Sequence, residues 1–213
     1  MKRLLLGFGL IASPILGQAE SFTASSASTG STASGRLDVS ITVPAVLYLR
    51  IGTGSAVAAA NNTTIDALTF TVPAANVGDG TVISAAAGNG DQGNGAVTVR
   101  VFSNVGTNVS LNSNVAGQLR SPAGDTIPWS QIAVASAALP VPSNGYTNGP
   151  ITHPAFSATS GNGTATTLSA VGKLVRVEGR WTFSYSNASV VPAGTYGNTV
   201  ANFGRVTYTA TQL

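Results

Sequence analysis

The chain has 213 residues, of which 43% are hydrophobic and 8% are charged, with no Cys and a formal net charge of +3. Soluble proteins carry about 25% charged residues, and long helices or coiled coils need abundant Glu, Lys, Arg and Leu, so a helical protein is excluded. The few scattered basic residues argue against nucleic-acid binding, and the ordinary apolar fraction excludes a charge-rich disordered chain.

The first residues are organised like a secretory signal peptide. Lys2 and Arg3 precede an apolar run over 4–16, and Gly17 and Ala19 are small residues placed before a cleavage site. The run is shorter than the roughly 20 residues that span a bilayer. We therefore expect residues 1–19 to be removed, leaving an exported chain without a membrane span. That mature chain carries eight basic and seven acidic residues, so the basic isoelectric point belongs mainly to the export signal.

Residues 20–35 form a low-complexity Ser, Thr and Ala segment, which predicts a flexible leader. Residues 36–213 are expected to form one β-sandwich domain. At its start, over 36–43, apolar residues alternate with polar ones, which predicts a strand with one apolar face. Pro44 then interrupts the pattern, because proline cannot donate a ladder hydrogen bond. The apolar residues of this segment are Leu37, Val39, Ile41 and Val43.

The rest of the chain repeats this alternation in short segments bounded by Gly, Pro and Asn. Val175, Val177, Trp181 and Phe183 share one face of the longest segment, and Glu178 falls on the opposite, polar face. Many short strands with such turns predict an all-β, antiparallel sandwich or barrel, and secretion favours the sandwich. The expected strands lie over 47–51, 68–72, 97–101, 109–111, 132–134, 173–185 and 199–209.

The sequence offers little catalytic chemistry. His153 is the single histidine, and no Gly-x-Ser-x-Gly elbow accompanies it, so we expect a loop residue rather than a general base. No two acidic residues lie close in sequence, and a zinc site needs more Cys or His than the chain contains. We expect neither an enzyme nor a cofactor or metal site.

Two weaker signals remain open. The Gly88–Gly95 loop fits either a calcium site or a flexible turn, although Asp91 is its single carboxylate. Trp129, Trp181 and Tyr196 are candidates for a sugar-stacking surface, although alternation places Trp181 in the core.

Five segments carry a resemblance to a known family: Ser34–Val43, Leu68–Phe70, Ala96–Leu111, Ile127–Trp129 and Pro192–Val200. Together they resemble the spore coat protein U domains, which are related to archaic chaperone–usher pilins. The similarity covers most of the mature chain and is clearest at 192–200, which resembles the family's C-terminal Pro-x-Gly-x-Tyr-x-Asp-x-Val signature. Family members usually carry two Cys that are absent here, which leaves open a distant secreted relative that does not polymerise.

The resemblance implies an immunoglobulin-like sandwich that lacks one strand and is completed by donor-strand exchange. The candidate donor is the 36–43 strand, and the alternative is that this strand belongs to its own sheet. The implied function is a structural subunit of a surface fimbria, pilus or coat, acting in adhesion and biofilm. The implied partners are copies of itself, a periplasmic chaperone and an outer-membrane usher. A self-contained secreted adhesin or carbohydrate-binding module is the alternative function.

Overall fold

The computed structural model describes residues 21–25, 28–55 and 60–213. The predicted signal peptide, 1–19, lies outside the described residues. The chain separates into two units, Met1–Pro44 and Ala45–Leu213. Every strand of the described residues belongs to the second unit. The predicted boundary at Arg36 falls inside the first unit, and the unit that carries the described strands begins at Ala45.

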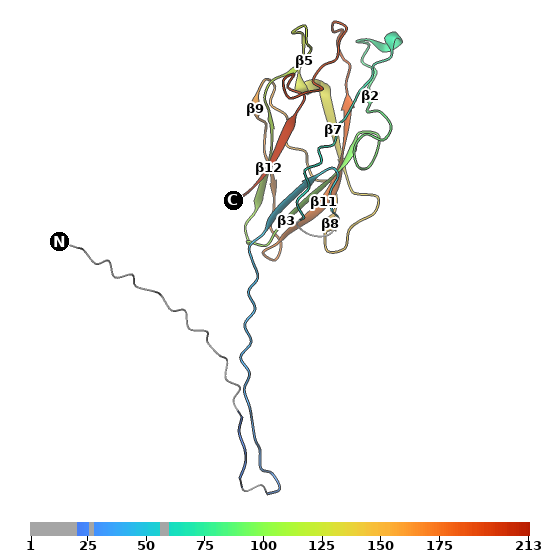
Figure 1. Cartoon of the computed structure of the whole chain (residues 1–213). Helices are drawn as coiled ribbons and strands as arrows, with labels where there is room; N and C mark the ends of the chain where they lie inside the picture. The colour runs from blue at the N-terminus through green and yellow to red at the C-terminus, as the bar shows by residue number, and fades with distance from the viewer. Residues whose placement is uncertain (1–20, 26–27, 56–59) are drawn as a thin grey trace, which may run out of the picture. The chain divides into compact units, whose positions relative to one another are not determined.

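The first sheet is built around the two long strands β3 and β11, which pair antiparallel (Figure 1). β1 pairs with the other side of β3, and β2, β7 and β8 add to β11. The short β8–β11 contact is the one parallel pair among the described strands. The strands are β1 (Leu47–Ile51), β2 (Ile83–Ser84), β3 (Ala96–Ser103), β7 (Ile132–Ala137), β8 (Thr147–Asn148) and β11 (Val175–Tyr185).

The second sheet has the order β10-β4-β12, and β9 also pairs with β4. Two short 3-10 helices and the β5–β6 pair complete the described elements. No helix among the described residues has the length and hydropathy to cross a membrane. The remaining bounds are β4 (Val109–Val115), β9 (Gly161–Asn162), β10 (Thr166–Leu168), β12 (Val206–Gln212), β5 (Leu119–Arg120), β6 (Thr126–Ile127), η1 (Ala74–Asn76) and η2 (Trp129–Gln131).

The core lies between the two sheets. Val99, Val101 and Trp181 of the first sheet and Val109 and Leu111 of the second are 0% exposed and belong to one buried cluster. Each such side chain contributes about 1.5–3 kcal/mol when it leaves water, so a chain without disulfides is stabilised mainly by this layer. The prediction of an all-β, antiparallel sandwich is confirmed, and the immunoglobulin-like topology stays a prediction.

Most of the strand predictions are confirmed, because β1, β3, β4, β7 and β11 fall on the expected segments. The strand expected over 199–209 is confirmed only from Val206, where β12 begins, because residues 200–203 form a turn. The prediction of a strand over 68–72 is wrong. Half-buried Leu68, Phe70 and Val72 alternate with exposed threonines, as in a strand, yet the segment pairs with no other strand. Its backbone is held at Thr69 instead, whose C=O accepts from the Ala86 N–H and whose N–H donates to the Asn89 side-chain oxygen.

Glu178 lies on the polar face of β11, yet its side chain is 0% exposed. The segment between β7 and β8 covers this part of β11, and Ser143 donates its backbone N–H to Glu178 Oε1. Arg100, 2% exposed on β3, donates to Glu178 Oε2 from Nη2 at 2.7 Å and from Nε at 3.1 Å. The Tyr146 ring lies 4.6 Å from the Arg100 guanidinium carbon. The alternation of residue types within β11 could not reveal that a segment distant in sequence covers Glu178.

Candidate functional site

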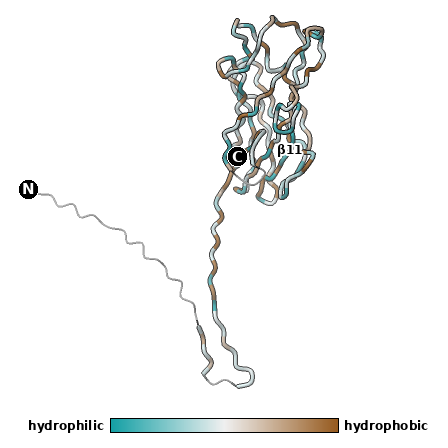
Figure 2. Tube along the Cα trace, turned by 45° about the vertical axis from the view of Figure 1, so that its right-hand side comes forward, coloured by the Kyte–Doolittle hydropathy of each residue, from teal (hydrophilic) through white to brown (hydrophobic). Residues whose placement is uncertain are grey.

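The apolar residues of the 36–43 segment are exposed in the single chain. Leu37, Val39, Ile41 and Val43 are 83%, 74%, 83% and 73% exposed, and residues 36–46 belong to no strand. Hydrophobic residues recur along this segment (Figure 2). The strand prediction is therefore not met within one chain. An extended segment with this pattern needs a neighbouring strand and an apolar surface to become ordered.

The C-terminal strand β12 is an edge strand of the second sheet. It pairs with β4 through the register Val206↔Val115 to Gln212↔Val109, and no described strand pairs with its other side. Along β12, half-buried Val206, Tyr208 and Ala210 alternate with exposed threonines. Such an edge presents unpaired backbone groups and is a template for another strand.

β1 is the corresponding edge of the first sheet, because β3 is its one partner strand among the described residues. Leu47 is 39% exposed, and half-buried Leu49 and Ile51 pack against the core cluster. β1 and β12 contact each other across the two sheets. The two open edges therefore adjoin, and an added strand there would bring its apolar side chains to the margin of the core.

His153 supports β12 from within the sandwich. Its Nε2 lies 2.7 Å from Tyr208 Oη, and its ring makes edge contacts with Phe156, Trp181 and Phe183. Burial among these rings lowers the pKa of His153 from 6.5 to about 4, because the charged imidazolium loses hydration. Burial likewise raises the pKa of Tyr208. The sequence predicted a loop residue, and the structure adds that the His153 imidazole is half-buried and neutral beneath an edge strand.

We expect acid to destabilise the sandwich through His153. An unfolded histidine binds a proton near pH 6.5 and the folded one only near pH 4, so stability is full above pH 6.5 and decreases as the pH falls. The free energy of unfolding should drop by about 2 kcal/mol between pH 7 and pH 5. Urea unfolding at both pH values measures this. His153→Gln should remove most of the drop, and an unchanged drop in that variant would assign it to other groups.

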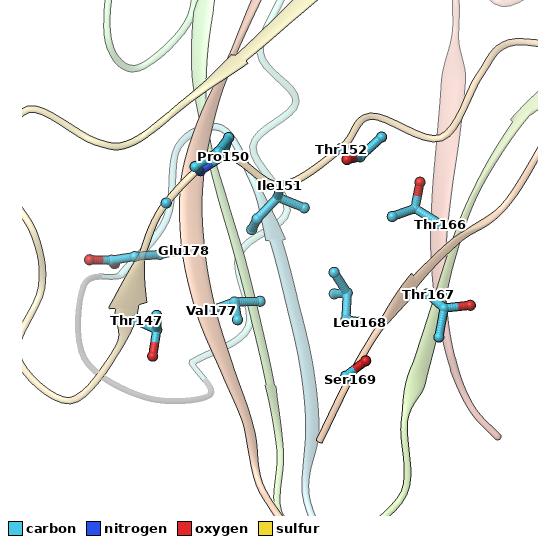
Figure 3. Close-up of a pocket in the computed structure, with 11 residues that line it drawn as sticks. Thr147, Pro150, Ile151, Thr152, Thr166, Thr167, Leu168, Ser169, Val177 and Glu178 are labelled. Carbon is cyan, nitrogen blue, oxygen red and sulfur yellow. The ribbon is translucent and has the colours of Figure 1, made fainter. Parts of the chain in front are cut away.

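Two cavities lie on other parts of the sandwich. One, of about 280 Å³, has Ile151, Leu168 and Val177 converging on it while Glu178 points to the other side of β11 (Figure 3). Glu178 is its one titratable lining residue and is held by Arg100. The other, of about 440 Å³, lies beside Trp129 and the half-buried His153. Neither brings together a general acid and a general base.

The calcium and sugar hypotheses gain no support from the geometry. The Asp91 carboxylate accepts hydrogen bonds from Arg50 and from the Thr98 N–H, and the described residues contain no cluster of three or more metal-ligating side chains. Trp181 is 0% and Trp129 6% exposed, while half-buried Tyr196 packs on a separate cluster with Tyr185. These aromatic rings do not form one exposed stacking surface.

The four candidate donor residues come from the sequence pattern, whereas the open edges were not evident from the sequence. The only signal for β12 was its alternating pattern, which does not tell an edge strand from a central one. Comparison of the chain with protein-family models, with curated proteins and with solved structures finds no match.

Proposed function

We propose that the chain is a secreted structural subunit of a surface fimbria, pilus or coat that assembles by donor-strand complementation. The 36–43 segment of one copy adds to the adjoining β1 and β12 edges of the next. The observation that carries the proposal is the exposure, between 73% and 83%, of four apolar side chains at alternate positions of one segment. The sandwich is then immunoglobulin-like and lacks one strand until assembly.

The energetics favour such an addition. Burial of Leu37, Val39, Ile41 and Val43 would contribute about 1.5–3 kcal/mol each. Main-chain pairing with the edge strand gives further affinity, and the alternate side chains give specificity. Until the next copy arrives, the open edges are an aggregation hazard. This explains the need for a periplasmic chaperone that covers them and an outer-membrane usher that receives the subunit.

The composition suits this role. The mature chain has eight basic and seven acidic residues, so charge repulsion between copies is weak. The exposed threonines of β12 offer polar contacts without charge. A self-contained adhesin or carbohydrate-binding module would need a complete sandwich and an exposed aromatic cluster. The open edges of β1 and β12 and the lack of a shared exposed surface for Trp129, Trp181 and Tyr196 do not favour it.

A chain beginning at Ala45 tests the proposal. We expect the mature chain to form filaments or ladders, seen by negative-stain microscopy and size-exclusion chromatography, and the shortened chain to remain unassembled. The shortened chain should bind a fluorescent peptide of residues 36–43, measured by anisotropy. A peptide with Ser at the four apolar positions is the control. Assembly of the shortened chain, or equal binding of both peptides, would contradict the proposal.

A further inference from the structure

The spacing of apolar residues around the start of β1 matches the register that the donor segment would need to pair with β1 of its own chain. Two runs of apolar residues at alternate positions flank the linker Pro44-Ala45-Val46. If these three residues formed a hairpin loop, the two runs would face the same side of the ladder, because their spacing is even. The opposed pairs would be Val43 with Leu47, Ile41 with Leu49 and Val39 with Ile51.

Self-closure would suppress assembly. A segment tethered by a short flexible linker has an effective concentration on the order of millimolar at its own site. A second copy at micromolar concentration would lose that competition by about a thousandfold. A chain that assembles through 36–43 therefore needs a feature that keeps this segment from the edge of its own β1.

Val46 supplies that feature through both of its backbone polar groups. Its N–H donates to Asn104 Oδ1 at 2.7 Å, and its C=O accepts from the Asn104 N–H at 3.3 Å. Asn104 directly follows β3, whose last residue, Ser103, is paired with Leu47. The two bonds therefore extend the β1–β3 ladder by one residue and hold Val46 in line with β1.

The same residue is stereochemically wrong for the loop. A three-residue hairpin loop places its last residue in the left-handed region, where Gly or Asn is favoured and a β-branched residue is strongly disfavoured. The non-glycine residues with positive φ among the described residues are Asn94, Lys173, Asn187 and Phe203, so Val46 does not have this conformation. Pro44 also prevents a two-residue loop beginning there, because its φ is held near −65°.

We infer that Val46, clamped by Asn104, is a latch that keeps the 36–43 strand from completing its own sandwich and reserves it for a second copy of this chain. The inference rests on the proposed function and adds a reason for the direction of assembly. Asn104 and Val46 are positioning residues, because they act on the linker rather than on the docked strand.

A crosslinking experiment on the mature chain tests the latch. The chain has no Cys, so the pair Thr42→Cys and Thr209→Cys, the latter at an exposed position, can be crosslinked selectively. The crosslink reports whether the 36–43 strand lies beside β12 of its own chain or beside β12 of a second copy. With a short bis-maleimide, this background should give ladders of linked chains on denaturing gels. Adding Val46→Gly and Asn104→Ala, which permit the loop, should convert the ladders to linked monomers and lower the assembled fraction at least tenfold.

The control adds Val46→Ala and Asn104→Ala, which removes the side-chain bond of the clamp without permitting a left-handed residue, and should keep the ladders. Val46→Gly alone serves if the double change prevents folding, as judged by circular dichroism. Unchanged ladders in the glycine variant would overturn the latch while leaving donor-strand assembly intact. A background that shows neither linked chains nor assemblies would overturn the proposed function, and the latch with it.

Discussion

Replacing Ile41 with Asp should abolish assembly of the mature chain and leave the sandwich folded. Ile41 is 83% exposed in the single chain, so its removal costs the isolated subunit almost nothing. In a docked strand the same position enters an apolar site. The variant would lose about 1.5–3 kcal/mol of burial and would also bury an unpaired carboxylate, which costs several kcal/mol more. Negative-stain microscopy and size-exclusion chromatography measure the loss.

Ser40→Asp is the matched control, because it introduces the same charge at the neighbouring position on the opposite face of the segment. We expect Ser40→Asp to assemble with at most a modest loss. Equal urea unfolding of both variants and the parent would show that the subunit itself is unaffected. Filaments from Ile41→Asp as abundant as those of the parent would exclude 36–43 as the donor.

Replacing Glu178 with Gln should destabilise the folded subunit by about 3–5 kcal/mol, because breaking a buried ion pair leaves the partner charge uncompensated. Arg100 is 2% exposed and Glu178 0%, so water cannot replace the lost carboxylate. Glu178 Oε1 also accepts the backbone N–H of Ser143, so the change should loosen the segment that covers the sheet. Urea unfolding measures the free energy difference.

The double variant Arg100→Met with Glu178→Leu separates the charge from the packing. Removing both charges should recover much of the lost stability, since apolar groups of similar volume often replace a buried pair without loss. Arg176→Met, at an exposed position two residues earlier on β11, should change the free energy of unfolding by less than about 0.5 kcal/mol. Equal destabilisation by the single and double variants would instead assign the effect to packing.

Alternation predicted those strands whose polar and apolar faces meet different surroundings. β12 is the clearest case, since half-buried Tyr208 and Ala210 alternate with exposed threonines as the sequence indicates. β3 is different: Thr98 and Arg100 lie on its polar face yet are 2% exposed. The cover comes from segments distant in sequence, including Ser143, whose hydroxyl oxygen accepts a hydrogen bond from Arg100. No local pattern contains that information.

The sequence by itself determined the class of fold and the candidate donor, because period-two apolar residues and turn-forming residues are local properties of the chain. Only the tertiary structure decided which strands are edges, since an edge is defined by the absence of a neighbour. It also decided that Leu37, Val39, Ile41 and Val43 lie exposed while Leu49 and Ile51, with the same alternation, pack on the core. The physical reason is pairing: β1 has β3 beside it, whereas the 36–43 segment has no partner strand within the described chain.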